Sequence, residues 1–229
     1  MSDADLTAHL VALVLDRSPR PVRELVAEVD ADEDAVRASL AALERHRLVR
    51  WDAGRTRVSF AYGRRELADA ADPAMRRLAD ESGETVNLMV RTGHGAEAVA
   101  QVDGRHVLGV SSWVGREVPE HCSAAGKVFL AFGASAPRES LERLTARTIV
   151  HPDQLARDLD LVRARGYATI VDELEMGLAA VAAPIRDADG QVVAALSVAG
   201  PTARLGPSRL AVVGRLAVEQ ADAVSKELA

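Results

Sequence analysis

The segment HCSAAGK, residues 121–127, has residue types that could bind a small anion. A serine followed by small residues and an apolar run is typical of a helix that begins near Ser123. The first N–H groups of such a helix have no partner within it and attract a carboxylate, and Ala124 and Ala125 would let a ligand approach closely. The alternative is that Ala124, Ala125 and Gly126 are small only because they pack against a sheet.

His121 and Cys122 have side chains that could ligate a metal or act as a nucleophile and its base. Successive side chains of an extended segment point to opposite sides, however, so this pair cannot face one site. The six histidines show no ligand-like spacing with the single cysteine. We therefore predict no metal site, no cofactor and no catalytic residue, and we interpret Cys122 as a small buried side chain beside a binding pocket. An enzyme is the alternative, but the chain shows no nucleophile–base pair and no phosphate loop.

A second group with its own chemistry is a run of seven arginines between residues 45 and 65, which is opposed by a single acid, Asp52. Arginine binds phosphate well, and phosphate contacts supply most of the sequence-independent affinity for DNA. Because the net charge of the whole chain is −6, any surface that attracts nucleic acid must be local. The predicted DNA-binding residues are Arg37, Arg45, Arg47, Arg50, Arg55 and Arg57.

The elements that would position these arginines lie in the first sixty residues. Apolar side chains at helical spacing predict three helices, carried by Leu6–Val14, Val22–Val29 and Val36–Leu43. Two extended runs around Asp52–Gly54 then predict a hairpin. Three helices followed by a hairpin are typical of a winged helix-turn-helix that binds double-stranded DNA. The alternative is a small helical bundle without this function.

The third predicted helix begins with four acids, Asp30, Asp32, Glu33 and Asp34. We interpret them as residues that cap the helix and interact with its positive end. Its outward face also includes Ala38, Ala41 and Arg45, which offer few donors to base edges. The sequence therefore favours phosphate contacts over direct reading of bases.

The rest of the chain predicts an α+β fold around an antiparallel sheet. A helix is expected to begin at Asp72–Pro73, and alternating strands are expected from Val86 onward. A hairpin should turn at Asp189–Gly190, and a closing helix should be capped by Ser208. A second amphipathic helix should end at Gly166. The lone cysteine excludes an internal disulfide, and no run of eighteen apolar residues or secretory signal is present. We therefore expect a cytoplasmic protein that does not span a membrane.

Several motifs together resemble the IclR family of bacterial transcriptional regulators. They are SGETVNL (82–88), HCSAAGKVFLA (121–131), LTARTI (144–149) and the long segment from VRARGY to SVAGP (162–201), followed by an amphipathic helix. The resemblance implies a winged helix-turn-helix in residues 1–62, a linker helix segment at 63–72 and a GAF-like effector-binding domain in residues 73–229. It also implies a homodimer or a dimer of dimers that responds to a small organic acid or aromatic metabolite.

Matching to the family residue by residue adds to the predicted effector site. The full set of predicted effector-binding residues is Val110, Trp113, Cys122, Ser123, Ala124, Ala125, Asp172, Glu173, Ala180, Ser197 and Ala199. For Asp172 and Glu173 the alternative is a loop that only caps its own backbone or faces water.

The leading hypothesis is a regulator in which effector binding and operator binding are linked. The family usually has Thr and Arg where this chain has Ala35 and Ala38. The alternative function is therefore a ligand sensor that acts through a protein partner and has weak or lost specific DNA binding.

Overall fold

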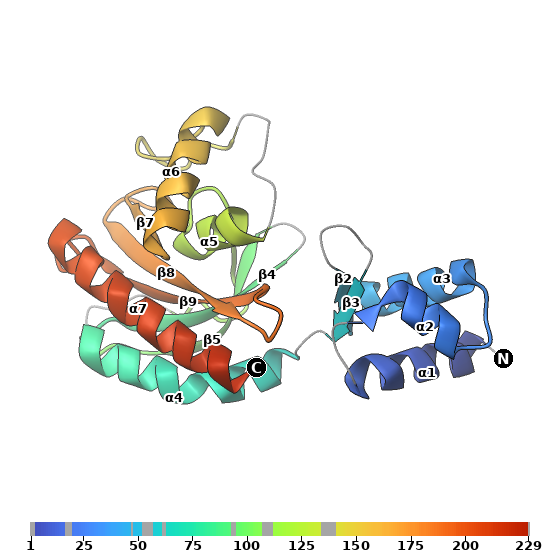
Figure 1. The fold of residues 1–229 in the computed structure, drawn as a ribbon. Helices are drawn as coiled ribbons and strands as arrows, with labels where there is room; N and C mark the ends of the chain where they lie inside the picture. The colour runs from blue at the N-terminus through green and yellow to red at the C-terminus, as the bar shows by residue number, and fades with distance from the viewer. Residues whose placement is uncertain are drawn as a thin grey trace. The chain divides into compact units, whose positions relative to one another are not determined.

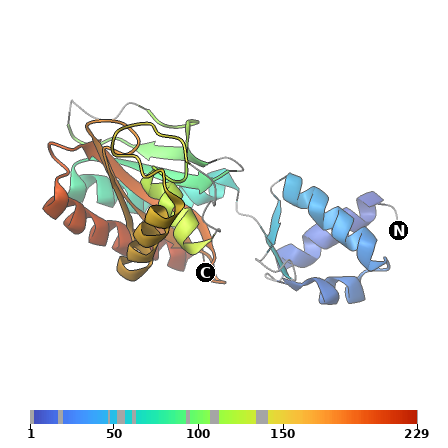
Figure 2. The ribbon, with the colours of Figure 1, turned by 90° about the horizontal axis from the view of Figure 1, so that it is seen from above.

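The computed structural model describes residues 3–16, 20–46, 48–51, 57–60, 63–92, 95–106, 112–133 and 141–228. The chain divides into two compact units, Met1–Glu66 and Leu67–Ala229. Both units combine helices with an antiparallel sheet (Figures 1 and 2). The α+β class expected from the sequence is therefore confirmed.

The first unit contains three helices and a small sheet. Helices α1 (Asp3–Asp16), α2 (Val22–Glu28) and α3 (Glu33–Arg45) enclose a core that includes Leu10, Leu25 and Leu40. Strands β1 (Arg20–Pro21), β2 (Val49–Trp51) and β3 (Arg57–Phe60) form an antiparallel sheet in the order β1-β3-β2. The three helices and the β2–β3 pair follow the prediction, whereas β1 is too short to leave a periodic signal. The predicted turn at Asp52–Gly54 lies outside the described residues.

The acidic start of α3 has the structural role expected from the sequence. Asp32 is the N-cap, and its carboxylate accepts a hydrogen bond from the N–H of Ala35 at 2.8 Å. Glu33 and Asp34 lie in the first turn, where negative charge favours the positive end of the helix.

Helix α4 (Arg64–Ser82) corrects the prediction that a helix begins at Asp72–Pro73. Pro73 lies inside the helix, although proline lacks the N–H that the preceding turn would bind. The apolar stripe from Leu67 through Ala71 to Leu78 is buried on both sides of Pro73. Burial of this stripe outweighs the loss of one backbone hydrogen bond, so the segment expected as a linker, 63–72, is helical from Arg64 onward.

The second unit is built on a six-stranded antiparallel sheet in the order β6-β5-β4-β9-β8-β7. The strands are β4 (Thr85–Arg91), β5 (Ala96–Val102), β6 (Glu117–Val118), β7 (Ala168–Val171), β8 (Leu178–Arg186) and β9 (Val192–Pro201). Helices α4 and α7 (Pro207–Glu227) cover one face of the sheet (Figure 1). Helices α5 (Ala124–Phe132) and α6 (Pro152–Arg165) lie side by side on the other face (Figures 1 and 2).

The ends of the helices agree with the sequence in one case and differ in another. Helix α6 ends at Gly166, whose φ of 83° is the left-handed conformation that favours glycine, as predicted. Helix α7 begins at Pro207 with Gly206 as its N-cap and no side-chain cap, so the expectation of a Ser208 cap is wrong. Proline with its preset φ starts this helix instead. No helix in the described part of the chain is long and apolar enough to cross a membrane.

Candidate functional site

A pocket lies between the first turn of α5 and the face of the sheet that α5 covers. The empty space inside it, open mouth included, is about 420 Å³. Its lining residues are Asn87, Met89, Trp113, Val118, Ser123, Ala124, Ala125, Ile170, Leu174, Leu178, Ala180, Ser197 and Ala199. The wall is mainly apolar with a few polar groups, which is the usual composition of a small-molecule site.

The α5 wall of the pocket is held by its N-cap. The hydroxyl of Ser123 donates to the carbonyl oxygen of Pro119 at 2.6 Å and accepts from the N–H of Gly126 at 3.2 Å. A Cβ atom at Gly126 would lie 2.2 Å from the Cα of Glu120, so only glycine allows this close approach. The N–H groups of Ala124 and Ala125 have no partner within the helix and start it with partial positive charge. This wall can therefore receive an anion.

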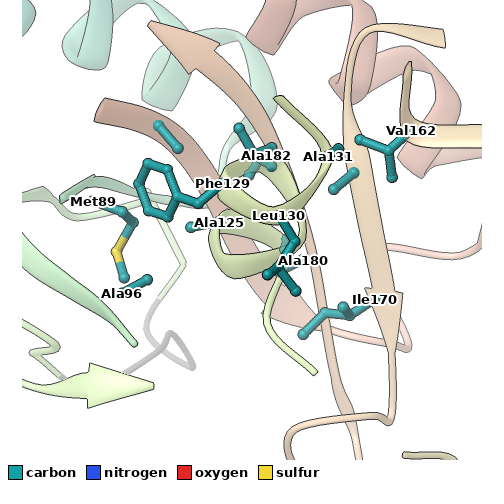
Figure 3. Close-up of a cluster of buried hydrophobic side chains, with 14 of the residues drawn as sticks. Met89, Ala96, Ala125, Phe129, Leu130, Ala131, Val162, Ile170, Ala180 and Ala182 are labelled. Atoms are coloured by element: carbon teal, nitrogen blue, oxygen red, sulfur yellow. The ribbon is translucent and has the colours of Figure 1, made fainter. Parts of the chain in front are cut away.

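The sheet wall of the pocket is open because its side chains are small. Ala180 on β8 pairs with Ala199 on β9, and Asn87 on β4 pairs with Ser197 on β9. Met89 and Ala125, both labelled in Figure 3, belong to the buried cluster around this space. Alanine and serine at these positions leave room that larger side chains would fill.

Two polar groups of the wall have no hydrogen-bond partner among the described residues. They are the side-chain oxygen of Asn87 and the indole N–H of Trp113, and both atoms are fully buried. Buried polar groups nearly always have a partner, so these two are candidates to meet a ligand or water.

Seven predicted effector-binding residues are brought together in this pocket: Trp113, Ser123, Ala124, Ala125, Ala180, Ser197 and Ala199. Cys122 is completely buried next to them but does not line the space. Val110 lies outside the described residues. The residues predicted from the sequence therefore include the start of one helix and positions on two strands that line the same pocket.

The predicted residues Asp172 and Glu173 are not part of the lining, and the loop after β7 explains why. Asp172 has a φ of 60°, and its carboxylate accepts from the N–H of Gly177 at 2.6 Å, so it closes its own loop. The hydroxyls of Thr145 and Thr148 donate to the carbonyl oxygens of Asp172 and Glu173 at 2.5 and 2.7 Å. The loop thus directs its two acids to structural partners.

The loop contributes apolar rather than acidic side chains to the pocket. Leu174 and Leu178 line it, in place of the two carboxylates expected from the sequence. Nothing in the local pattern DELEMGL distinguishes which of these side chains turns inward.

Glu173 binds Lys127, the only lysine among the fully buried side chains of the described residues. The Lys127 ammonium lies 2.8 Å from both carboxylate oxygens of Glu173 and 2.7 Å from Oδ2 of Asp158. Lys127 belongs to α5, Asp158 to α6 and Glu173 to the loop after β7. One buried cation therefore ties together three segments around the pocket.

Burial shifts two pKa values near this cluster. It raises the pKa of the Glu173 carboxyl above its ordinary value of 4.5, although Lys127 acts in the opposite direction. Burial also raises the pKa of the Cys122 thiol to about 12, and the negative charge of Glu173 adds to this shift. Cys122 is thus held as a neutral thiol, which suits a small packing residue better than a nucleophile.

The lining residues that sequence reasoning missed are Asn87, Met89, Val118, Ile170, Leu174 and Leu178. Asn87 left one signal, because it is the polar residue inside the strand segment VNLMV. The others are ordinary apolar strand or loop residues. Among the residues that the structure describes, no cluster of three or more His, Cys, Asp or Glu could hold a metal ion.

The predicted DNA-binding arginines lie in the first unit. Arg37 and Arg45 are exposed on α3, and the Arg37 guanidinium forms an ion pair of 2.7 Å with Glu33. Arg50 lies in β2, opposite Ser59 of β3 in the strand register. Arg57 lies in β3, opposite Pro21 of β1. Arg47 and Arg55 lie outside the described residues.

Comparison with known proteins identifies relatives of this chain. The family described as "Bacterial transcriptional regulator IclR C-terminal" matches residues 60–226. The HTH-type transcriptional repressor AllR of Klebsiella pneumoniae is 36% identical over 173 residues, which cover 72% of this chain and 62% of the relative. The transcriptional repressor IclR of Escherichia coli K12 is 35% identical over 175 residues, covering 73% and 64%. The matched regions thus span less than two thirds of these relatives.

Solved structures show the same fold. The IclR protein of Thermotoga maritima superposes with a TM-score of 0.66 at 24% identity, covering 97% of this chain and 96% of that one. The C-terminal domain of KdgR from Escherichia coli superposes with a TM-score of 0.60 at 30% identity, covering 71% and 98%. The curated relatives named above are transcriptional repressors. On the family match and the identity to these repressors, this chain belongs to the IclR family of bacterial transcriptional regulators.

Proposed function

We propose that this chain regulates transcription by binding operator DNA through its N-terminal unit and a small organic acid through the pocket of its second unit. Residues 1–62 would form a winged helix-turn-helix, 63–72 a linker and 73–229 a GAF-like effector domain. The active form would be a homodimer or a dimer of dimers. The observation that carries this proposal is the pocket at the start of α5, in a member of a regulator family.

The pocket supports an acidic effector. The free N–H groups at the start of α5 and the helix dipole favour a carboxylate at that wall. Trp113 and the apolar side chains Met89 and Ile170 would cover the carbon skeleton. Among the described lining residues there is no carboxylate that would repel an anion.

The first unit supports DNA as the partner. It has three helices followed by paired strands, and arginines lie on α3, β2 and β3. Arginines on such elements can contact phosphates on either side of a groove. The relatives' names describe repressors, which act on DNA.

The test measures binding to the DNA upstream of the protein's own gene and to unrelated DNA of equal length, by fluorescence anisotropy at two salt concentrations. We expect the upstream DNA to bind at least about 10³-fold more tightly, as specific sites do. Equal affinities for the two DNA fragments would contradict a role as an operator-binding protein.

A second candidate is a ligand sensor that acts through a protein partner. The observation that favours it is the ion pair between Glu33 and Arg37, which occupies one of the few long donors on the outward face of α3. Equal affinities in the same DNA experiment, together with binding of an acid in the pocket, would support this candidate. Glu33→Gln would then leave DNA binding unchanged, whereas an operator-binding α3 should gain affinity from the released arginine.

A further inference from the structure

Asn87 carries a buried side-chain oxygen that no described residue pairs. It lies on β4 with 4% of its surface exposed, and its side-chain oxygen has no hydrogen-bond partner among the described residues. By contrast, Gln101 on the neighbouring strand accepts from the N–H of Trp113 at 2.9 Å and donates to Asp103 at 2.6 Å. A buried side-chain oxygen without a hydrogen-bond partner costs stability, which points to a partner that the described residues do not supply.

The surroundings of Asn87 show which kind of partner would fit. Asn87 is the cross-strand neighbour of Ser197, which is 7% exposed, and both residues line the pocket. The indole N–H of Trp113 is a third buried polar group of the same lining, and it is a donor without a partner among the described residues. The pocket therefore offers an amide, a hydroxyl and an indole N–H in addition to the N–H groups at the start of α5.

We propose that Asn87 is an effector-binding residue and that the effector is a small carboxylic acid that also carries a hydroxyl group. This inference rests on the proposed acid-binding function of the pocket. The carboxylate meets the first turn of α5 at Ala124 and Ala125, and the hydroxyl donates to the side-chain oxygen of Asn87. A hydroxyl can accept a hydrogen bond while it donates one, so the same group can also accept from the indole of Trp113.

An acid without the hydroxyl would fit the same space but would leave Asn87 and Trp113 unpaired. Sites built to hydrogen-bond a ligand hydroxyl reject the analogue that lacks it, because their buried polar groups then have no partner. The small volume of the pocket suits an acid of a few carbons.

The experiment compares lactate with propanoate, which differ by one hydroxyl, by isothermal titration calorimetry on the full chain. We expect the wild type to bind lactate at least about 10-fold more tightly than propanoate, the usual consequence of an unpaired buried group. In Asn87→Leu, which keeps the branched shape and the number of heavy atoms of the side chain, the two affinities should agree within a factor of about 3 because the acceptor is gone. Asn87→Ala, which leaves the space open, should lose the preference as well.

Thermal unfolding without ligand separates this role from a structural one. Because no described residue pairs the side-chain oxygen of Asn87, the Tm of Asn87→Leu should equal or exceed that of the wild type. In contrast, Gln101→Leu removes an amide with two partners and should lower the Tm. A lower Tm for Asn87→Leu would assign the amide to the fold and overturn the inference.

The outcomes also distinguish this inference from the function on which it rests. If the wild type binds lactate and propanoate equally, or if Asn87→Leu keeps the preference, the role of Asn87 is overturned while the acid pocket stands. If the wild type binds neither acid at millimolar concentration, the inference on Asn87 is overturned, and the acid pocket falls with it only when a wider panel of carboxylic acids also fails to bind.

Discussion

Individual buried groups of the second unit differ in whether the fold itself uses them. Lys127 forms ion pairs with Glu173 and Asp158, whereas the amide oxygen of Asn87 has no hydrogen-bond partner among the described residues. The sequence predicted Ser123, Ala124 and Ala125 because a helix start is a local pattern of cap and small residues. It could not predict that Glu173 turns to Lys127, 46 positions away, because that contact depends on the tertiary fold.

The raised pKa of Glu173 has a consequence for stability. The folded state holds the Glu173 proton more tightly than the unfolded state, so this group's contribution is present below pH 4.5 and is lost as the pH rises through the folded pKa. We therefore expect the unfolding free energy of Glu173→Gln, relative to wild type, to increase as the pH rises from about 4 to 7. Urea unfolding at several pH values measures this difference, and a flat or falling difference would contradict the assigned shift.

The raised pKa of Cys122 predicts a thiol that does not react in the folded protein. With a pKa of about 12, almost no thiolate forms at pH 8, and the side chain is completely buried. We expect Ellman's reagent to label Cys122 only as fast as the protein unfolds, and at once in denaturant. Rapid labelling of the native protein would show that the thiol is ionised and accessible.

At the scale of elements, burial decided where the sequence patterns held and where they did not. Helix α6 ends at Gly166 as predicted because the glycine stop is local. Helix α4 continues through Pro73, since the stripe from Leu67 to Leu78 is buried along the whole helix. Leu174, which lines the pocket, follows two residues whose carbonyl oxygens accept hydrogen bonds from Thr145 and Thr148, and no local pattern reveals these contacts.

The link that Lys127 makes between α5, α6 and the loop after β7 can be tested by Lys127→Met. The change leaves the carboxylates of Glu173 and Asp158 without their cation, and removal of one member of a buried pair costs about 3–5 kcal/mol. We expect urea unfolding to show a loss of about 3 kcal/mol in the free energy of unfolding, the low end of that range, because Asp158 is partly exposed. The triple variant with Glu173→Gln and Asp158→Asn should recover much of the loss. An unchanged free energy of unfolding for Lys127→Met would show that the ion pairs of Lys127 do not stabilise the fold.

Arg57 on β3, and Arg55 two positions before it in the sequence, carry the prediction on DNA affinity. Replacing Arg55 and Arg57 by alanine should weaken binding to specific and unrelated DNA alike. The slope of log affinity against log salt should become shallower by about 0.9 for each phosphate contact that is lost. Arg76→Ala, on the exposed face of α4 and paired with Asp72, is the matched control and should leave the slope unchanged. If the double variant has the same salt dependence of DNA binding as the wild type, Arg55 and Arg57 do not contact phosphates.

At the scale of the whole molecule, each of the two units offers features suited to a different partner. The first unit has arginines on α3, β2 and β3, and the second has a small pocket with two polar groups that no described residue pairs. If a bound acid changes the affinity for DNA, bound DNA must change the affinity for the acid by the same factor, typically 5- to 150-fold. The sequence predicted the fold class because the alternation of strands and amphipathic helices is regular, and it predicted part of the pocket because one wall is a helix start.

The pocket itself is the central claim, and thermal unfolding with a panel of small carboxylic acids tests it most directly. At least one acid should raise the Tm of the wild type, since a ligand at 100 times its Kd stabilises by about 2.7 kcal/mol. Ala125→Phe on α5 and Ala199→Leu on β9 fill the same space from opposite walls and should abolish the rise while keeping a cooperative transition. A panel in which no acid shifts the wild type, or in which both filled variants respond as the wild type does, would contradict the account.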